Sequence, residues 1–269
     1  VTGSTVFHLY ASSIEKLDVA FPSIEQQKAI GTFFKNLDNQ ITLKQHKLDK
    51  LITLKKAMLE KIFPKEGADE PEIRFKSFSG IWDSRVLGDV ASFYKGKGLP
   101  KSAIQDDGLF PCIHYGELFT NYSEVIETVT SKTNQNDNFV SICNDVLMPT
   151  SDVTPKGLVK SCCVKQSSVV LGGDILVIRP NDQDIIDGEF LSRFIRTREQ
   201  QVLQNVTGST VFHLYASSIE KLDIVFPSIG EQKAIGSYFK SLDNLISLQK
   251  TELTKLKQIK SSCLEKMFV

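Results

Sequence analysis

A repeat at the two ends of the chain constrains the fold more than any other feature of the sequence. Residues 1–64 align without gaps on residues 206–269, a shift of 205 positions, and residues 1–18 recur letter for letter at 206–223. Further along, the identity thins until mainly the apolar pattern survives. Two copies cannot form a solenoid, which needs three or more stacked units. The sequence therefore predicts two equivalent segments on either side of one unique middle, residues 75–205.

The later part of each copy has the pattern of a long helix. Its apolar residues recur at steps of four and three over some five heptads, which is typical of a coiled coil. Pro22-Ser23 and Pro227-Ser228 supply start signals, and Phe63-Pro64 supplies a stop. We expect helices over residues 23–64 and 228–269, each about 40 residues and about 60 Å long. The residues expected to pair these helices are Ile30, Phe34, Leu37, Ile41, Leu48, Leu51, Ile235, Phe239, Leu242, Ile246, Leu253 and Leu256. The stripe is interrupted at matching phases by Lys44, Lys55, Gln249 and Lys260.

The middle of the chain has short strand-like runs bounded by turns. Residues 85–94 are expected to form one such strand, and residues 189–204 an amphipathic helix. A polar linker over 65–80 precedes this region, so we expect a domain over 81–227. The predicted fold class is α+β, with one β-rich mixed domain and two long helices that pair as a coiled coil. Residues 1–22 are then an orphan tail, a copy of the segment that completes the domain.

The signatures of catalysis are missing. Lys95-Gly96-Lys97-Gly98 is rich in glycine but lacks the spacing of a phosphate-binding loop, and no His or Cys pair has zinc-ligand spacing. We therefore expect no enzymatic activity, no cofactor and no metal. The five cysteines form no C-x-x-C pair and are expected to be reduced, which favours a cytoplasmic protein. No apolar run is long enough for a membrane span, so no membrane contact is expected.

The charge of the middle region is uneven. Residues 81–205 hold 12 Lys and Arg against 16 Asp and Glu, a net charge of −4 within a chain of net charge zero. That balance argues against a simple DNA-binding domain. However, the lysines cluster near residues 95–101 and 156–165, and the acidic residues cluster near 182–189, which allows one basic face and one acidic face. Polar and aromatic residues interleave with the basic ones, and the residues alone leave two interpretations equally open: contacts to DNA, or ordinary solvated loops.

The order of these elements resembles the specificity (S) subunit of type I restriction–modification systems. The most specific part is the end of the domain where it runs into the helix, at Phe226-Pro227-Ser228 and Glu231-Gln232-Lys233-Ala234-Ile235. The loop Thr207–Thr210 before it, and Leu242-Asp243 after it, also fit and have counterparts in the first copy. The domain opening fits as well, with Phe78-Ser79-Gly80, Trp82 and Leu87-Gly88-Asp89-Val90.

The resemblance implies a non-catalytic DNA sequence-specificity subunit. In that family each target-recognition domain binds one half of a bipartite site in double-stranded DNA, and paired helices set the spacing between the halves. Modification (M) subunits methylate adenine, and restriction (R) subunits translocate and cleave the DNA. The family's DNA contacts lie in loops of the recognition domain. The residues nominated here for DNA contact are Lys95, Lys97, Lys101, Tyr115, Asn121, Tyr122, Lys156, Thr207, Ser209 and His213.

This chain departs from the family pattern in having two helices but one recognition domain. The orphan tail carries apolar residues for which the sequence shows no packing partner: Val6, Phe7, Leu9, Tyr10, Ile14, Leu17, Val19 and Phe21. Three arrangements stay open, in which the tail packs on its own chain, packs on a second copy in a C2 homodimer, or belongs to an incomplete product. The alternative functions are a coiled-coil adaptor that binds protein without sequence-specific DNA binding, and an enzyme with an unrecognised site.

Overall fold

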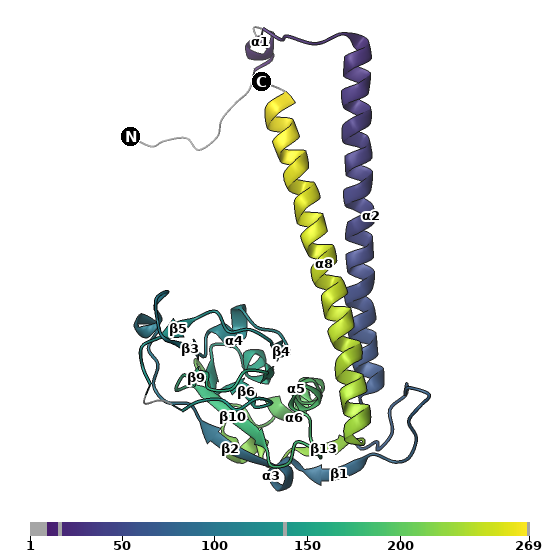
Figure 1. Ribbon diagram of the computed structural model, residues 1–269. Coiled ribbons are helices and arrows are strands. Elements are labelled where there is room, and N and C mark those ends of the chain that lie inside the picture. The colour runs from purple at the N-terminus through teal and green to yellow at the C-terminus, as the bar shows by residue number, and fades with distance from the viewer. Residues whose placement is uncertain (1–9, 16–17, 137–138, 268–269) are drawn as a thin grey trace. The chain divides into compact units, whose positions relative to one another are not determined.

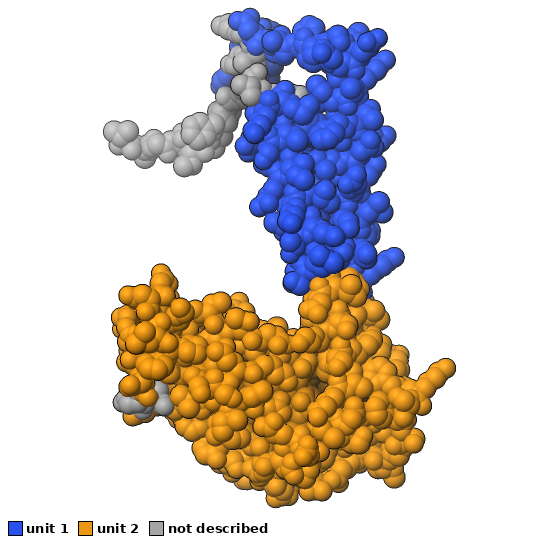
Figure 2. All heavy atoms as spheres, viewed as in Figure 1, with its two compact units in different colours: residues 1–50, 246–269 blue, residues 51–245 orange. Residues whose placement is uncertain are grey.

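The computed structural model describes residues 10–15, 18–136 and 139–267 (Figure 1). The chain divides into two compact units (Figure 2). Unit 1 comprises residues 1–50 and 246–269, and unit 2 comprises residues 51–245. Four of the apolar tail residues, Val6, Phe7, Leu9 and Leu17, lie outside the described residues. Each unit is described by itself below.

Unit 1 is built from parts of two long helices, α2 (Ile24–Ile62) and α8 (Ile229–Met267). The two run antiparallel here, because Asp38 forms an ion pair with Lys260 while Lys44 forms one with Glu252. Leu37, Leu48, Ile246 and Leu253 are buried in this unit. Three other residues of the predicted stripe are half-buried here, namely Ile30, Phe34 and Ile41, as is Leu256 of α8. At the start of α2, the Ser23 hydroxyl accepts from the backbone N–H of Gln26 at 3.3 Å and the Gln26 side chain accepts from the N–H of Ser23 at 3.1 Å, a reciprocal cap.

The polar residues that interrupt the apolar stripe make ion pairs or hydrogen bonds. Lys44 Nζ lies 2.5 Å from Glu252 Oε2, and Gln249 donates to the same carboxylate at 3.2 Å. Lys260 contacts Asp38. In unit 2, Lys55 lies 2.7 Å from Asp243 Oδ1. Lys55 with Asp243 and Lys260 with Asp38 are the same pair under the 205-residue shift, so the two copies of the repeat make equivalent contacts at these positions.

Unit 2 contains a β-rich domain with four small sheets. The largest has five strands in the order β2 (Ala91–Lys95), β10 (Ile175–Pro180), β6 (Val146–Pro149), β8 (Cys162–Val164), β4 (Val125–Ile126). Only the β8–β4 pair in it is parallel. A two-stranded sheet pairs β1 (Asp83–Val86) with β13 (Asp223–Phe226). The two three-stranded sheets are β11 (Thr207–Gly208), β12 (Phe212–His213), β7 (Ser151–Asp152), and β5 (Lys132–Thr133), β3 (Phe110–Ile113), β9 (Val170–Leu171). The short helical turns are α3 (Leu87–Val90), η1 (Lys101–Ala103), α4 (Glu117–Thr120), η2 (Pro155–Val159) and α7 (Ala216–Ile219).

The main core joins the domain to the helix ends inside unit 2. Helix α5 (Gly188–Thr197) contributes Phe190 and Phe194, which lie 5.3 Å and 6.2 Å from the ring of Phe63 at the end of α2. Phe239 of α8 stacks on Phe63 at 6.3 Å and is fully buried. Two more stripe residues, Ile235 and Leu242, also belong to this cluster, and the half-buried Leu51 packs against it. The fold class predicted from the sequence, a β-rich α+β domain with two long helices, is therefore confirmed.

Two expectations about single elements were wrong. The run 85–94 is not one strand, because α3 separates β1, which pairs with β13, from β2, which pairs with β10. The chain changes sheets at this point, and α3 is held by hydrogen bonds from its first backbone N–H groups to the segment around Glu220. The expected helix 189–204 is two helices, α5 and α6 (Glu199–Leu203), which meet at Arg198. The Arg198 side chain donates to the carbonyl of Pro64 at 2.8 Å, a long-range contact that no local pattern contains.

The orphan tail and its copy have different surroundings. In the tail, the short helix α1 (Ala11–Ile14) carries an exposed Ile14, and Phe21 is 77% exposed. In the second copy the same residues are Ile219 and Phe226, which are 1% and 4% exposed. These two residues are buried in the second copy because it contributes α7 and β13 to the domain.

Candidate nucleic-acid interface

One end of the five-stranded sheet collects most of the predicted contact residues. Lys95, the last residue of β2, pairs with the start of β10, and Pro149, the last residue of β6, also lies beside that start. Cys162 begins β8 next to the end of β6, and Val125 begins β4 beside β8. The loops at this end are residues 95–101, 113–122, 150–160, 172–174 and 207–213, and we call them the basic end.

The first group of contact candidates surrounds the end of β2. The backbone N–H of Gly96 donates to Ile175, and that of Lys97 donates to Leu171 at 3.1 Å. A Cβ atom on Gly96 would fall 2.0 Å from the Gly172 carbonyl oxygen, so only glycine fits this approach. Gly172 in turn donates to the carbonyl of Ile113, two residues before Tyr115. Tight backbone packing thus brings Lys95, Lys97 and Tyr115 to one place, with Lys101 following on η1.

The second group lies on the small sheet β11–β12–β7. Thr207 pairs with His213, and His213 pairs with Ser151. Thr207, Ser209 and His213 are exposed, and Lys156 on neighbouring η2 is exposed as well and forms an ion pair with Glu199 at 3.2 Å. The two groups are linked by Thr150, which donates to the Asp174 carbonyl at 2.9 Å and accepts from the Leu214 N–H at 3.0 Å.

The third group follows α4. Asn121 is exposed and donates to the Glu117 carboxylate at 3.2 Å. Tyr122 and Tyr115 are half-buried, because both rings pack against the second core cluster around Ile113 and Ile126. Burial, with the nearby charge of Glu117, raises the pKa of Tyr122 to about 12. These two tyrosines therefore serve the core as well as the surface.

The opposite end of the same sheet is acidic. The loops there, residues 140–145 and 181–187, hold four aspartates and no Lys or Arg, and we call them the acidic end. The basic end holds five lysines against three carboxylates. The aspartates of the acidic end are thus separated from the lysines of the basic end by the length of the strands. This separation leaves a basic surface available to phosphates.

Two basic residues outside the nominated set make aromatic contacts, Arg179 near the acidic end and Lys160 at the basic end. The guanidinium of Arg179 lies 5.0 Å from the ring centroid of Tyr94 and 5.4 Å from that of Phe139, and it makes a bidentate ion pair with Asp145. Lys160 donates to the Phe119 carbonyl at 2.7 Å and lies over its ring. These contacts join residues that are distant in the sequence, so only the charge of Arg179 and Lys160 could have been noticed beforehand.

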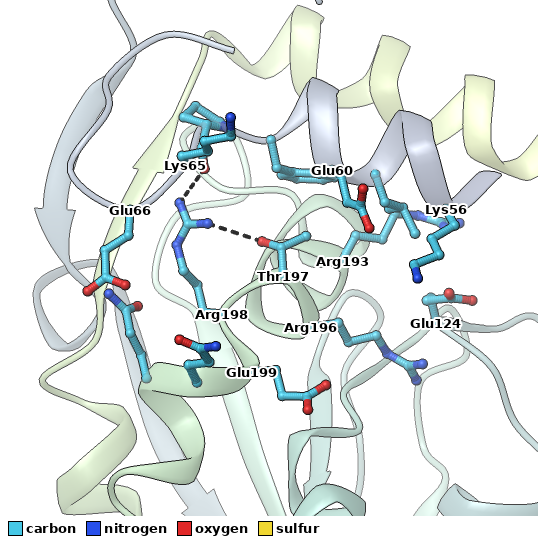
Figure 3. A pocket seen from close by; sticks show the side chains of 15 residues that line it. Lys56, Glu60, Lys65, Glu66, Glu124, Arg193, Arg196, Thr197, Arg198 and Glu199 are labelled. Atoms are coloured by element: carbon cyan, nitrogen blue, oxygen red, sulfur yellow. Dashed lines mark hydrogen bonds between the residues drawn. The ribbon is translucent and has the colours of Figure 1, made fainter. Parts of the chain in front are cut away.

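A cavity of about 620 Å³ lies elsewhere in unit 2, between the last turns of α2 and helices α5 and α6 (Figure 3). Arg198 on its wall is 8% exposed, and its guanidinium lies 4.3 Å from the Phe194 ring centroid. Burial lowers the pKa of Arg198, while Glu66 acts in the opposite direction. The bond from Arg198 to Pro64 fastens the linker after α2 to the domain, so this arginine has a structural role.

No group of three or more His, Cys, Asp or Glu side chains in the described part of the chain is arranged to hold a metal ion. Across residues 10–15, 18–136 and 139–267, no helix is both long and apolar enough to cross a bilayer.

The sequence matches the family described as type I restriction modification DNA specificity domain over residues 1–53 and 80–258. The chain therefore belongs to this family, which confirms the resemblance predicted from the sequence. Its fold is similar to the HsdS subunit from Thermoanaerobacter tengcongensis, with 17% identity, a TM-score of 0.59 and coverage of 100% of this chain and 64% of that one. It is also similar to the S subunit from M. genitalium, with 16% identity, a TM-score of 0.61 and coverage of 100% and 67%.

A third similar structure belongs to a study of complex assembly and conformational transition of the type I R-M system. Its identity is 18% and its TM-score 0.63, with coverage of 92% of this chain and 60% of that one. The chain thus spans about two thirds of the length of these proteins or slightly less. At this level of identity the three structures establish the fold.

Proposed function

We propose that this chain is the DNA sequence-specificity subunit of a type I restriction–modification complex. It binds one half of a bipartite site in double-stranded DNA through the basic end and has no catalytic activity of its own. The observation that carries the proposal is the convergence of the nominated residues on one end of the sheet, where lysines outnumber carboxylates, while the aspartates of the acidic end lie at the other. Lysines there contact phosphates, and the exposed Thr, Ser, Asn and His side chains contact base edges. This role places the chain in the cytoplasm with the DNA.

The M and R subunits are the proposed protein partners. The helix pair serves as the spacer to which M subunits attach, and they contribute part of the phosphate contact. This division of labour is supported by the modest charge of the basic end. The chain alone is therefore expected to bind DNA weakly at physiological salt.

A second recognition domain completes the proposed bipartite reader. Ile235 and Phe239 are fully buried against the domain, whereas their repeat counterparts Ile30 and Phe34 are only half-buried. The first copy thus offers the same residues with room for a partner. We propose that a second copy of the chain, in a C2 homodimer, is one source of that domain.

The test is methylation mapping. The chain is expressed with its M subunit in a methylation-deficient host, and the DNA is sequenced for methyladenine. A palindromic bipartite motif supports a homodimer, and an asymmetric motif supports a second domain from another chain. The absence of any motif would favour the protein-binding adaptor.

Charge variants connect the motif to the basic end. Lys95→Gln with Lys156→Gln should weaken DNA binding of the assembled complex and lower the slope of log K against log salt by up to about 2. Lys221→Gln is the control, because Lys221 is exposed and lies between Glu220 and Leu222, whose carbonyls accept from α3 at the end of the sheet away from Lys95. Equal effects of the control and the double variant would contradict the placement of the interface.

A further inference from the structure

A network of charged side chains joins the domain to both long helices within unit 2. Lys55 of α2 lies 2.9 Å from Glu124 and 2.7 Å from Asp243 of α8. Arg193 of α5 contacts the other Asp243 oxygen at 3.3 Å and Glu189 at 3.2 Å. Asp243 is thus the one carboxylate in this network that an α2 lysine and an α5 arginine share.

The arginine at the centre of this network has little freedom to move. Arg193 is 1% exposed, and its guanidinium lies 5.1 Å from the ring centroid of Phe239. Its Nε and Nη1 atoms have no hydrogen-bond partner in the described part of the chain. Because the remaining charge contacts are made through Nη2, Glu189 and Asp243 determine where this buried cation can lie.

The start of α8 adds two contacts that depend on close approach. The side chain of Gln232 is fully buried and donates to the carbonyls of Ile185 and Pro227, both at 2.8 Å, while it accepts from the Asp187 N–H. At Gly236, an added Cβ atom would lie 3.3 Å from the Glu189 carboxyl carbon. The helix therefore passes the start of α5 with little space to spare.

The repeat supplies an internal comparison for each of these positions. Gln27, the counterpart of Gln232, is exposed and donates to Pro22 at its own helix start. Gly31, the counterpart of Gly236, has nothing within 4 Å of an added Cβ atom. Asp38, the counterpart of Asp243, contacts Lys260 and has no arginine contact among the described residues. The same residue types thus have contacts to a recognition domain in one copy and lack them in the other.

We propose that Asp243, Arg193 and Lys55 are positioning residues that fix the orientation of the recognition domain on the helix pair, and thereby the spacing between the half-sites that are recognised. The inference rests on the proposed function. None of the three needs to touch DNA, because they act through the direction in which the basic end is held.

The apolar core alone does not account for this orientation. Apolar burial is non-directional, so a cluster of phenylalanines tolerates small rotations of one element on another. Buried charges tolerate them poorly, because each needs a partner at a defined place. Asp243 contacts Lys55 of α2 and Arg193 of α5. A rotation of the domain on the helices would break at least one of these two contacts.

The experiment measures a distance across this junction by double electron–electron resonance on the full-length chain. One nitroxide is placed on Cys143, which is exposed in the domain, and a second at position 241 of α8 after Ser241→Cys in a Cys263→Ser background. Both positions belong to unit 2. We expect one narrow distribution for the parent and a roughly twofold broader or shifted one for Asp243→Asn or Lys55→Met.

Asp38→Asn is the matched control, and it should leave this distribution unchanged because Asp38 belongs to the other copy. Asp243→Glu, which restores the charge, should recover most of the narrow distribution. Parent-like distributions for both Asp243→Asn and Lys55→Met, or equal broadening by Asp38→Asn, would overturn the inference. Circular dichroism establishes that each variant is folded, and Lys55→Met, which leaves the Asp243 contact with Arg193 in place, keeps the test decisive if Asp243→Asn is unstable.

Methylation mapping of the same variants separates this inference from the proposed function. If the parent gives a motif, the Asp243→Asn complex should keep the half-site sequences but accept spacers one base pair shorter or longer. A variant motif with unchanged spacing and full yield would contradict the positioning role alone. A parent without any motif would contradict the proposed function, whatever the distance measurement shows.

Discussion

Replacing Phe239 by alanine should destabilise unit 2 far more than the repeat-equivalent replacement of Phe34. The Phe239 side chain is fully buried and touches Phe63, Tyr238 and Arg193. Removal of a fully buried phenylalanine costs about 4 kcal/mol of unfolding free energy, including the cavity left behind. Phe34 is only half-buried, so its truncation should cost roughly 1–2 kcal/mol.

The single tryptophan of the chain provides the assay. Trp82 is 2% exposed and lies 5.7 Å from Phe190 in the same core cluster as Phe239, so its fluorescence reports the unfolding of unit 2. With a urea m-value of about 2.5 kcal/mol/M, a loss of 4 kcal/mol lowers the midpoint by roughly 1.5 M. Phe34→Ala should move the tryptophan transition by about 0.8 M at most.

This comparison removes the usual ambiguity of a single substitution. The two sites share residue type and helix register, and they differ mainly in whether a domain packs on them. Equal midpoint shifts for the two variants, or a larger shift for Phe34→Ala, would refute the assignment of Phe239 to the domain core.

Three further predictions concern the helix glycines, the buried Glu124 and the cysteines. Gly31→Ala should raise the helix stability by about 1 kcal/mol, whereas Gly236→Ala should gain less or destabilise because Glu189 must move, and thermal unfolding by circular dichroism compares the two. Burial raises the pKa of Glu124, but the nearby charges of Arg196 and Lys55 outweigh it and lower that pKa from 4.5 to about 2. The resulting stabilisation is present above pH 4.5 and is lost as the pH falls toward 2. Glu124→Gln should therefore reduce the fall in the urea midpoint between pH 7 and pH 2. A thiol reagent at neutral pH should modify Cys143 and Cys263 well before the three buried cysteines, and a fast reaction of all five would contradict the described core.

The helices were predictable because their signal is local and repeated. The apolar stripe, the prolines before each start and the proline after Phe63 lie within the segments that they define. The polar residues in the stripe were visible in the sequence, but their partners were not. Lys55 finds Asp243 only because the two helices run antiparallel, and that direction depends on contacts between segments almost 200 residues apart.

The candidate interface was predictable in its residue types but not in its arrangement. Lys95 and Lys156 are 61 positions apart, and the register of β2, β10 and β6 brings their loops to one end of the sheet. The contacts of Arg179 and Lys160 were not predictable because their aromatic partners come from other strands and turns. The break at Arg198 was missed for a similar reason, since its hydrogen bond reaches back to Pro64.

The two copies of the repeat separate what the sequence determines by itself from what tertiary structure decides. Each copy encodes a short helix at its ASSI segment followed by a long helix, and both copies adopt them, because each helix depends on interactions between neighbouring residues. Burial differs between them. Ile14 and Phe21 are exposed, whereas Ile219 and Phe226 are buried, although the residue types are the same. In the described structure the second copy pairs with β1 and packs against α3. Burial of an apolar side chain depends on whether a partner surface is present, and the sequence of the repeat by itself does not specify that surface.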